Sequence, residues 1–154
     1  MPIAMIVLAI VAHAVASAQR GERNVRVHSE ALRAQHAGLE RMTRELREAT
    51  SFQYVSSQAV QFELYVRRTG TTRSIRYDCS SASRCSRLEG PPGGTPTGPV
   101  TLVDGLENPN VFSAEPDPLA ARFVGIVARV RTAPNRPSIT LRDGVQLRNL
   151  SSRF

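Results

Sequence analysis

Few side chains in this 154-residue chain have the types and spacings that catalysis requires. The three histidines are His13, His28 and His36, so the chain after Thr50 contains none. Ser-His-Asp and Cys-His arrangements therefore cannot form within that later part. His28 and His36 are too far apart along a helix to bind one metal ion together, because that needs a spacing of about four residues. The sequence predicts no catalytic residue and no metal ligand.

The remaining candidates for chemistry are carboxylates and a glycine-rich stretch. No spacing among the carboxylates selects an acid/base pair, and most of them lie where turns are expected. They are Asp78, Glu89, Asp104, Glu107, Glu115, Asp117 and Asp143. Residues Gly90–Pro99 lack both the GxGxxG pattern and a terminal Lys-Ser/Thr, so a phosphate-binding role is unsupported. We therefore expect no enzymatic activity, no cofactor and no small-molecule substrate.

The two cysteines, Cys79 and Cys85, lie close together in the sequence. Their spacing suits a small disulfide-closed loop and does not suit a zinc site, which would need four ligands. Such a pair would stay reduced in the cytosol and oxidise outside it, which favours an extracytoplasmic location. The alternative, two unpaired surface thiols, remains open on the sequence alone.

The charge pattern bears on partners. The net charge is +7, and all 20 basic residues are arginine. These arginines are spread along the chain and mostly alternate with Glu or Asp, without a run of five or six like charges. That pattern favours a solvated surface over a nucleic-acid interface, which stays a secondary alternative.

The first 18 residues are uncharged and predict a hydrophobic membrane segment. As a helix, Pro2–Ala18 would be about 26 Å long, slightly short of a bilayer core of about 30 Å. Three interpretations are open: a signal peptide cleaved after Ala18, an ordinary anchor, or an anchor that begins upstream of Met1. The expected anchor residues are Ile3, Met5, Ile6, Val7, Leu8, Ile10, Val11 and Val15.

Residues 19–50 predict an amphipathic helical stalk that continues from the membrane segment. No proline interrupts this stretch, and apolar residues recur every seven positions up to Leu39 and Leu46. We expect Leu39, Met42 and Leu46 to pack against a sheet. The pairs Glu40/Arg44 and Arg41/Glu45 are spaced i,i+4, which suggests ion pairs on solvent-facing sides of the helix.

Residues 51–154 predict an extracytoplasmic β-rich domain. Alternation places Val60, Phe62, Leu64 and Val66 on one face of a strand over 59–68. Further strands are expected over 73–79, 84–89, 100–106, 123–132, 138–141 and 145–150, and loops over 90–99 and 107–118. A helix followed by such strands indicates an α+β fold, with a long N-terminal helix packed on a small antiparallel sheet.

This layout resembles the type IV pilins and type II secretion pseudopilins. The resemblance rests on the uncharged segment, on LERMTRELREAT over Leu39–Thr50 and on the closing ITLRDGVQLRNL over Ile139–Leu150. The chain lacks the family's basic leader, its cleavage-site glycine and its Phe-Thr-Leu-x-Glu motif.

The resemblance implies a structural subunit of a filament, secretion or DNA-uptake apparatus. Such a subunit would span the bacterial cytoplasmic membrane once, display its C-terminal domain outside and contact other subunits through the N-terminal helix. Loops over 80–86, 90–99 and 107–118 would then select neighbours or ligands. The alternative is a secreted or membrane-tethered binding domain that is not part of a filament.

Overall fold

The computed structural model describes residues 13, 26, 28–81, 83–133, 136–148 and 150. Within them, one helix covers residues 28–47 and eight strands form two antiparallel sheets. The chain divides into two compact units, Met1–Arg33 and Ala34–Phe154. The described residues of the first unit, 13, 26 and 28–33, are all helical. Everything that follows concerns the second unit.

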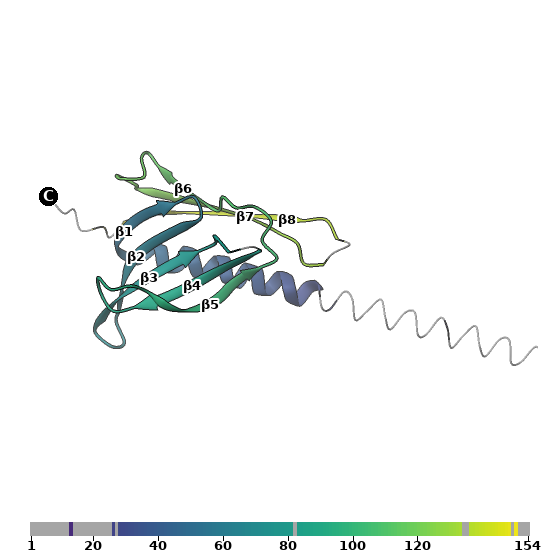
Figure 1. Ribbon diagram of the computed structural model, residues 1–154, viewed down its shortest axis with the longest axis horizontal. Coiled ribbons are helices and arrows are strands. Elements are labelled where there is room, and N and C mark those ends of the chain that lie inside the picture. The colour runs from purple at the N-terminus through teal and green to yellow at the C-terminus, as the bar shows by residue number, and fades with distance from the viewer. Residues whose placement is uncertain are drawn as a thin grey trace, which may run out of the picture. The chain divides into compact units, whose positions relative to one another are not determined.

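The larger sheet has five strands in simple sequential order (Figure 1). They are β1 (Ala49–Ser56), β2 (Ala59–Val66), β3 (Thr71–Asp78), β4 (Arg84–Gly90) and β5 (Thr97–Asp104). Each strand pairs with the next by a hairpin connection, which is why the order follows the chain. The register places Phe62 opposite Ile75 and Val60 opposite Tyr77, and all four side chains are buried.

The smaller sheet has three strands: β6 (Phe112–Glu115), β7 (Phe123–Val130) and β8 (Ile139–Gln146). Along β7 the side chains of Val124, Ile126, Ala128 and Val130 are buried, whereas those between them are not. This period of two is expected of a strand that packs one face on a core and leaves the other in water.

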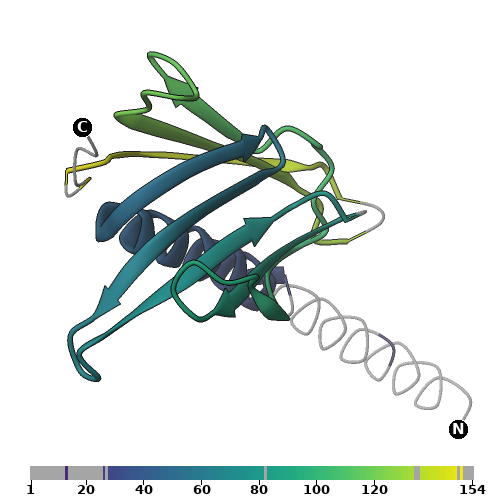
Figure 2. The same ribbon diagram turned by 60° about the vertical axis from the view of Figure 1, so that its left-hand side comes forward.

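The two sheets meet beside β1 and enclose one hydrophobic core (Figure 2). The main-chain oxygen of Ser57, just after β1, accepts hydrogen bonds from the amides of Val111 and Phe112 at 2.8 and 2.9 Å. The Tyr54 hydroxyl on β1 donates to the Phe112 carbonyl of β6 at 3.2 Å. A β-bridge between Leu106 and Val130 ties the segment after β5 to β7.

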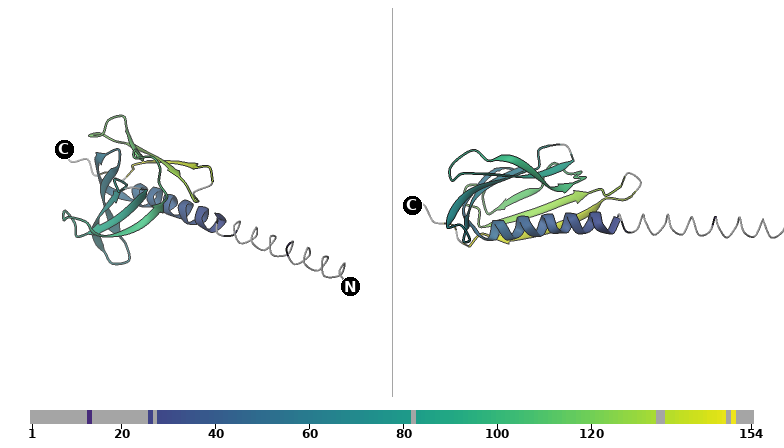
Figure 3. Two further views of the ribbon diagram at one scale, coloured as in Figure 1. Left: turned by 45° about the vertical axis from the view of Figure 1, so that its right-hand side comes forward. Right: turned by 90° about the horizontal axis from the view of Figure 1, so that it is seen from below.

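The helix packs into this core along one face. Leu39, Met42 and Leu46 are 5%, 1% and 0% exposed. The Thr43 hydroxyl donates to Asp143 Oδ2 of β8 at 2.6 Å, and Gln35 Oε1 accepts from the Asp104 amide of β5 at 3.1 Å. The helix thus contacts both sheets, and Figure 3 shows it running alongside them. It closes the side of the core that lies between β5 and β8.

The expected α+β fold with one small sheet is wrong: the domain is mostly β, with two sheets. Two unexpected strands account for the difference. The helix ends at residue 47 and β1 begins at Ala49, within the stretch predicted to be helical. The strand β6 lies inside the predicted loop 107–118. The two strands expected over 138–141 and 145–150 are replaced by one strand, β8, which runs through Asp143 and Gly144.

The expected long N-terminal helix and single-pass membrane location are also overturned. In the part of the chain that the structure describes, no helix combines the length and the apolar character needed to cross a membrane. The eight proposed anchor residues, from Ile3 to Val15, lie outside the described residues. The membrane-spanning pilin description is therefore unsupported.

Gly38 gives a direct test of how closely the helix approaches β5. A Cβ atom at this position would overlap the carbonyl oxygen of Leu102 and lie 3.1 Å from the carbonyl carbon of the same residue. Alanine favours helices over glycine by about 1 kcal/mol, but overpacking costs about 1–3 kcal/mol. We expect Gly38→Ala to lower the free energy of unfolding by about 1 kcal/mol in urea denaturation. Ala37→Gly, at the exposed neighbouring position, measures helix propensity alone. A stabilised Gly38→Ala variant would contradict the close approach.

Candidate functional site

A buried network of ionisable groups joins the helix to the larger sheet. Glu45 is 9% exposed, although its i,i+4 spacing from Arg41 suggested a solvent-facing pair. Its Oε2 accepts hydrogen bonds from the Tyr77 hydroxyl at 2.7 Å and from Arg87 Nε at 2.9 Å. Its Oε1 accepts from Arg41 Nε at 2.9 Å. Both oxygens of the carboxylate are therefore matched by donors.

The network continues from the core to the surface. Arg87 Nη1 donates to Glu89 Oε2 at 2.6 Å, and Glu89 also pairs with Arg73 at the rim of β3. The side chain of Arg87 is only 10% exposed, whereas that of Arg73 is 46% exposed. A chain of alternating charges thus leads from the buried Glu45 to water.

Titration in this network is shifted by burial and by the paired charges. Burial opposes ionisation of Glu45, yet hydrogen bonds from Arg41, Arg87 and Tyr77 outweigh it and hold the pKa of Glu45 below its ordinary value. Burial and the adjacent Glu45 charge raise the pKa of Tyr77. Hydrogen bonds from Arg87 and Arg73 lower the pKa of Glu89.

The buried members of this network, Glu45 and Tyr77, have the features of a structural link. A catalytic acid or base must reach substrate, but Glu45 and Tyr77 lie in the core and line none of the four pockets described for this domain. Their oxygens are committed to one another and to arginines. The network instead fixes how the helix sits on β3 and β4.

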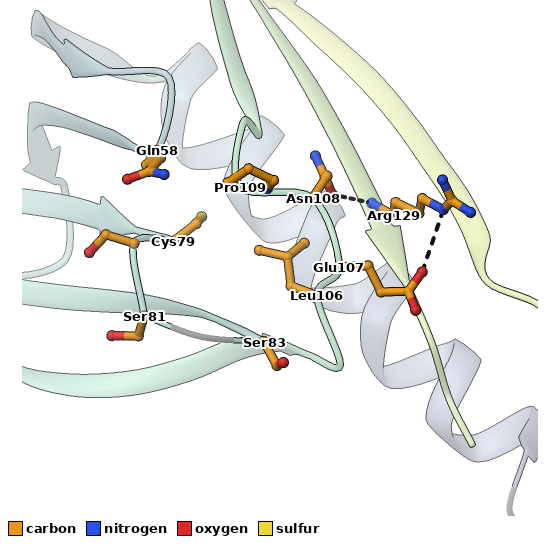
Figure 4. A pocket seen from close by; sticks show the side chains of 10 residues that line it. Gln58, Cys79, Ser81, Ser83, Leu106, Glu107, Asn108, Pro109 and Arg129 are labelled. Atoms are coloured by element: carbon orange, nitrogen blue, oxygen red, sulfur yellow. Dashed lines mark hydrogen bonds and ion pairs between the residues drawn. The ribbon is translucent and has the colours of Figure 1, made fainter. Parts of the chain in front are cut away.

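One pocket of the domain, of about 760 Å³, lies beside the disulfide loop (Figure 4), and another, of about 720 Å³, is lined by residues around Leu119 and Leu147. Four segments far apart in the sequence contribute to the first: the β1–β2 turn, the β3–β4 loop, the segment between β5 and β6, and β7. Its lining residues are Gln58, Cys79, Ser80, Ser81, Ser83, Leu106, Glu107, Asn108, Pro109 and Arg129. Its volume falls within the range of about 300–1,000 Å³ that is usual for small-ligand sites.

The disulfide between Cys79 and Cys85 shapes one wall of this pocket. Both cysteines are buried, and the loop that they close carries Ser80, Ser81 and Ser83 into the lining. The Cys79 amide donates to the Gln58 carbonyl at 2.8 Å, so the β1–β2 turn is held against the same loop.

Asn108 fixes the opposite wall. Its Nδ2 donates to the carbonyls of Asn110 and Val127 at 2.6 and 2.7 Å, and its Oδ1 accepts from the Arg129 amide at 2.6 Å. At the rim, Glu107 pairs with Arg129 at 3.4 Å and with Arg131 at 2.6 Å. Every polar atom of the Asn108 side chain is therefore hydrogen-bonded to the main chain of the domain.

Three polar groups of the lining stay uncommitted. Among the described residues, no protein partner is found for the hydroxyls of Ser81 and Ser83, which are exposed to water, or for the side-chain amide of the half-buried Gln58. Ser83 also has a φ of 62°, in the left-handed region that a residue with a Cβ rarely adopts. Its carbonyl accepts from the Leu106 amide at 2.9 Å, which holds this conformation in place.

The structure brings together two of the three loops that the sequence singled out. Residues from both 80–86 and 107–118 line the pocket, whereas 90–99 forms the end of the β4–β5 hairpin. Leu39, Met42 and Leu46 lie in the core, away from the pocket. Sequence reasoning missed Gln58 and Arg129, because nothing in the chain marks a turn glutamine or a strand arginine as neighbours of the cysteine loop. Among the described residues, no three His, Cys, Asp or Glu side chains are grouped to hold a metal ion.

The Glu45 network should make stability depend on pH. The pKa of Glu45 is lower in the folded chain than its ordinary value of 4.5, so its stabilisation is present above that value and is lost as pH falls further. We expect Glu45→Gln to lower the free energy of unfolding at pH 7 by about 3 kcal/mol, because Arg87 loses its buried partner. The loss should shrink as pH falls below 4.5, measured by urea denaturation at each pH.

Glu40→Gln is the matched control, since Glu40 lies on the exposed side of the same helix. Its effect should stay within about 0.5 kcal/mol. If the two variants have the same stability and the same pH profile, Glu45 does not act as a buried ion-pair partner.

The disulfide should stabilise the domain by limiting the unfolded chain. The cysteines are six residues apart, and closing so small a loop is worth about 2 kcal/mol in the chain-entropy model. We expect the double variant Cys79→Ala/Cys85→Ala to lose that amount in urea denaturation. The expectation fails if reduction with a phosphine leaves the unfolding midpoint of the natural chain unchanged.

Comparison with known proteins does not assign a function to this pocket or to the chain. No protein-family model, curated protein sequence or solved structure matches the chain. What the chain does must therefore be argued from its fold, its pocket and its surface.

Proposed function

We propose that the chain is an extracytoplasmic, non-enzymatic structural subunit that assembles with other subunits through its helix. This is the assembly role that the likeness to pilins implies, and it does not depend on the expected membrane-spanning anchor. The observation that supports it best is that one face of the helix packs in the core, whereas the opposite face is exposed.

The inner face of the helix is held by several independent contacts. Gln35 binds the end of β5, Thr43 binds β8, and Glu45 binds β3 and β4. Because these contacts reach both sheets, a force or a contact applied to the helix is transmitted to the whole domain. A helix held in this way can serve as a rigid attachment for a displayed domain.

The outer face of the same helix offers a surface for a second subunit. Ala34, Ala37, Glu40, Arg44 and Arg47 are exposed. Alanines allow close approach of another helix, and the mixed charges allow pairing between copies. The residues that pack in the core lie on the opposite side of the helix. An interface on the outer face would therefore not reduce the stability of the folded domain.

The disulfide supports the extracytoplasmic part of the proposal. Disulfides form and persist mainly in oxidising compartments, and this one is buried in the core. The non-enzymatic part is supported by the geometry of the ionisable groups: those with shifted pKa values either lie in the core or are paired on the surface.

Crosslinking through a single introduced thiol tests the helix interface. The only two cysteines are joined in a disulfide, so Ala37→Cys gives the full-length chain one free thiol on the outer helix face. We expect a bismaleimide crosslinker to yield covalent dimers of Ala37→Cys, detected on denaturing gels. We also expect self-association of the natural chain in sedimentation velocity.

Leu119→Cys is the matched control, because Leu119 is 99% exposed and lies in the β6–β7 connection. It should react with the reagent yet form few dimers. A natural chain that sediments as a monomer, with both variants crosslinking equally poorly, would overturn the assembly role.

A further inference from the structure

We propose that copies of this chain contact one another head to tail, with the basic β2–β3 hairpin of one copy docked on the acidic β6–β7 connection of the next. That the partner is another copy rests on the proposed assembly role. The contact itself is a second one, because neither element includes a residue of the outer helix face.

The β2–β3 hairpin extends beyond the strands on both of its sides. The first residue of β1, Ala49, pairs with Leu64 of β2, and the last residue of β4, Gly90, pairs with Ser74 of β3. Residues 65–73, here called the basic finger, therefore have no further neighbouring strand among the described residues, and Figure 2 shows them projecting from the larger sheet. Such an element can contact another molecule without disturbing the sheet.

The basic finger carries positive charge that is only partly matched. Its charged residues are Arg67, Arg68 and Arg73, and within the described part of the chain only Arg73 has an ion-pair partner, Glu89. Both Arg67 and Arg68 are exposed, and Tyr65 at the start of the finger is 49% exposed. Arginine and tyrosine are the residue types that most often anchor contacts between proteins.

The connection between β6 and β7 has the opposite charge. Residues 115–120, here called the acidic loop, are all exposed, and their charged members are Glu115 and Asp117. Neither acid has an ion-pair partner among the residues that the structure describes. Leu119 is 99% exposed, and its amide donates to Asp117 Oδ1 at 2.7 Å, which holds the loop in shape. The acidic loop thus offers two carboxylates and one large apolar side chain.

Charges at the bases of the two elements leave their signs opposite. At the base of the finger lie Glu63 and Glu89, and three arginines against these two acids leave a net charge of +1. Arg122 follows the acidic loop, and two acids against this one arginine leave −1. Arg148 lies further away, because it follows β8, and β7 separates β8 from β6.

The two elements can meet only between copies. In Figures 1 and 2 the acidic loop lies at the top of the domain and the basic finger at the bottom. A contact between the finger of one copy and the loop of the next leaves one element of each kind free at the ends, so it can repeat along a filament. Pairing of two fingers would bring unmatched arginines together, which disfavours a symmetric dimer through this surface.

The test is crosslinking between two variants of the full-length chain. Thr69→Cys gives a finger-thiol chain and Ala120→Cys a loop-thiol chain, and both positions are exposed. The natural cysteines are joined in a disulfide, so each variant has one free thiol. We expect a short bismaleimide to join the two variants when they are mixed and to give few dimers with either variant alone. Mass spectrometry of the crosslinked peptides identifies the joined thiols.

Charge reversal tests the contact itself. Arg67→Glu/Arg68→Glu in the finger-thiol chain should lower the yield of mixed dimers at least about fivefold, because attraction becomes repulsion. Glu115→Arg/Asp117→Asn in the loop-thiol chain should then restore the yield. Asparagine at position 117 keeps the side-chain oxygen that accepts from the Leu119 amide.

Arg142→Glu in the finger-thiol chain is the matched control. Arg142 is exposed on β8, lies outside both elements and, among the described residues, has no ion-pair partner. Its reversal should change the yield by less than about twofold. All the substituted positions are exposed, so the unfolding midpoints of the variants in urea should match that of the natural chain.

Three outcomes overturn the proposal. The first is a mixture that crosslinks no better than the separate variants. The second is a reversal in the finger that lowers the yield no more than Arg142→Glu does. The third is a yield that reversal in the acidic loop does not restore, which would assign the finger to a different acidic partner. Crosslinking of Ala37→Cys at the helix should respond to neither reversal, so failure of the helix interface and failure of this contact are read separately.

Discussion

The position of the helix depends on one buried carboxylate. Apolar contacts from Leu39, Met42 and Leu46 favour burial but accept many registers, because dispersion and hydrophobic forces have little directionality. The hydrogen bonds of Glu45, by contrast, can form in only one register of the helix. Sliding the helix by one turn would take its carboxylate away from Tyr77 and Arg87 and leave a charge in the core without partners. Since Tyr77 lies on β3 and Arg87 on β4, the same carboxylate also fixes those strands relative to the helix. The contacts of Gln35 with β5 and Thr43 with β8 extend this register to the rest of the domain.

Sequence patterns located the apolar part of this design well. A seven-residue spacing picks out Leu39 and Leu46, and alternation picks out Val60 and Phe62, all of which are buried, whereas Leu64 and Val66 on the same face are only partly buried. These signals are local, because a residue and its neighbours two to seven positions away share one face. The polar part of the design is not local. Spacing pairs Glu45 with Arg41 on the surface, yet its decisive partners lie 32 and 42 residues later.

The same distinction explains the pocket and the second sheet. Gln58, Ser83, Asn108 and Arg129 become neighbours only after the two sheets meet beside β1, and no pattern in the chain encodes that meeting. β6 has four residues and is stabilised by pairing with β7, so it looks like loop in isolation. β1 follows the helix after a single residue, and its polar serines and glutamine dilute the strand signal. The polar side chains that fill the pocket's wall are those expected in any turn, which is why their type carried no information.

The bond between Thr43 and Asp143 joins residues 100 positions apart, from the helix that opens the domain to the strand that ends it. A nascent chain that lacks β8 therefore has nothing to cover that flank of the helix. Contacts of such long range slow folding, because a large loop must close before they form. A chain exported from the N-terminus would thus reach its destination with the core still open. Under the extracytoplasmic role proposed above, this late closure would keep the chain unfolded until its last strand had crossed the membrane.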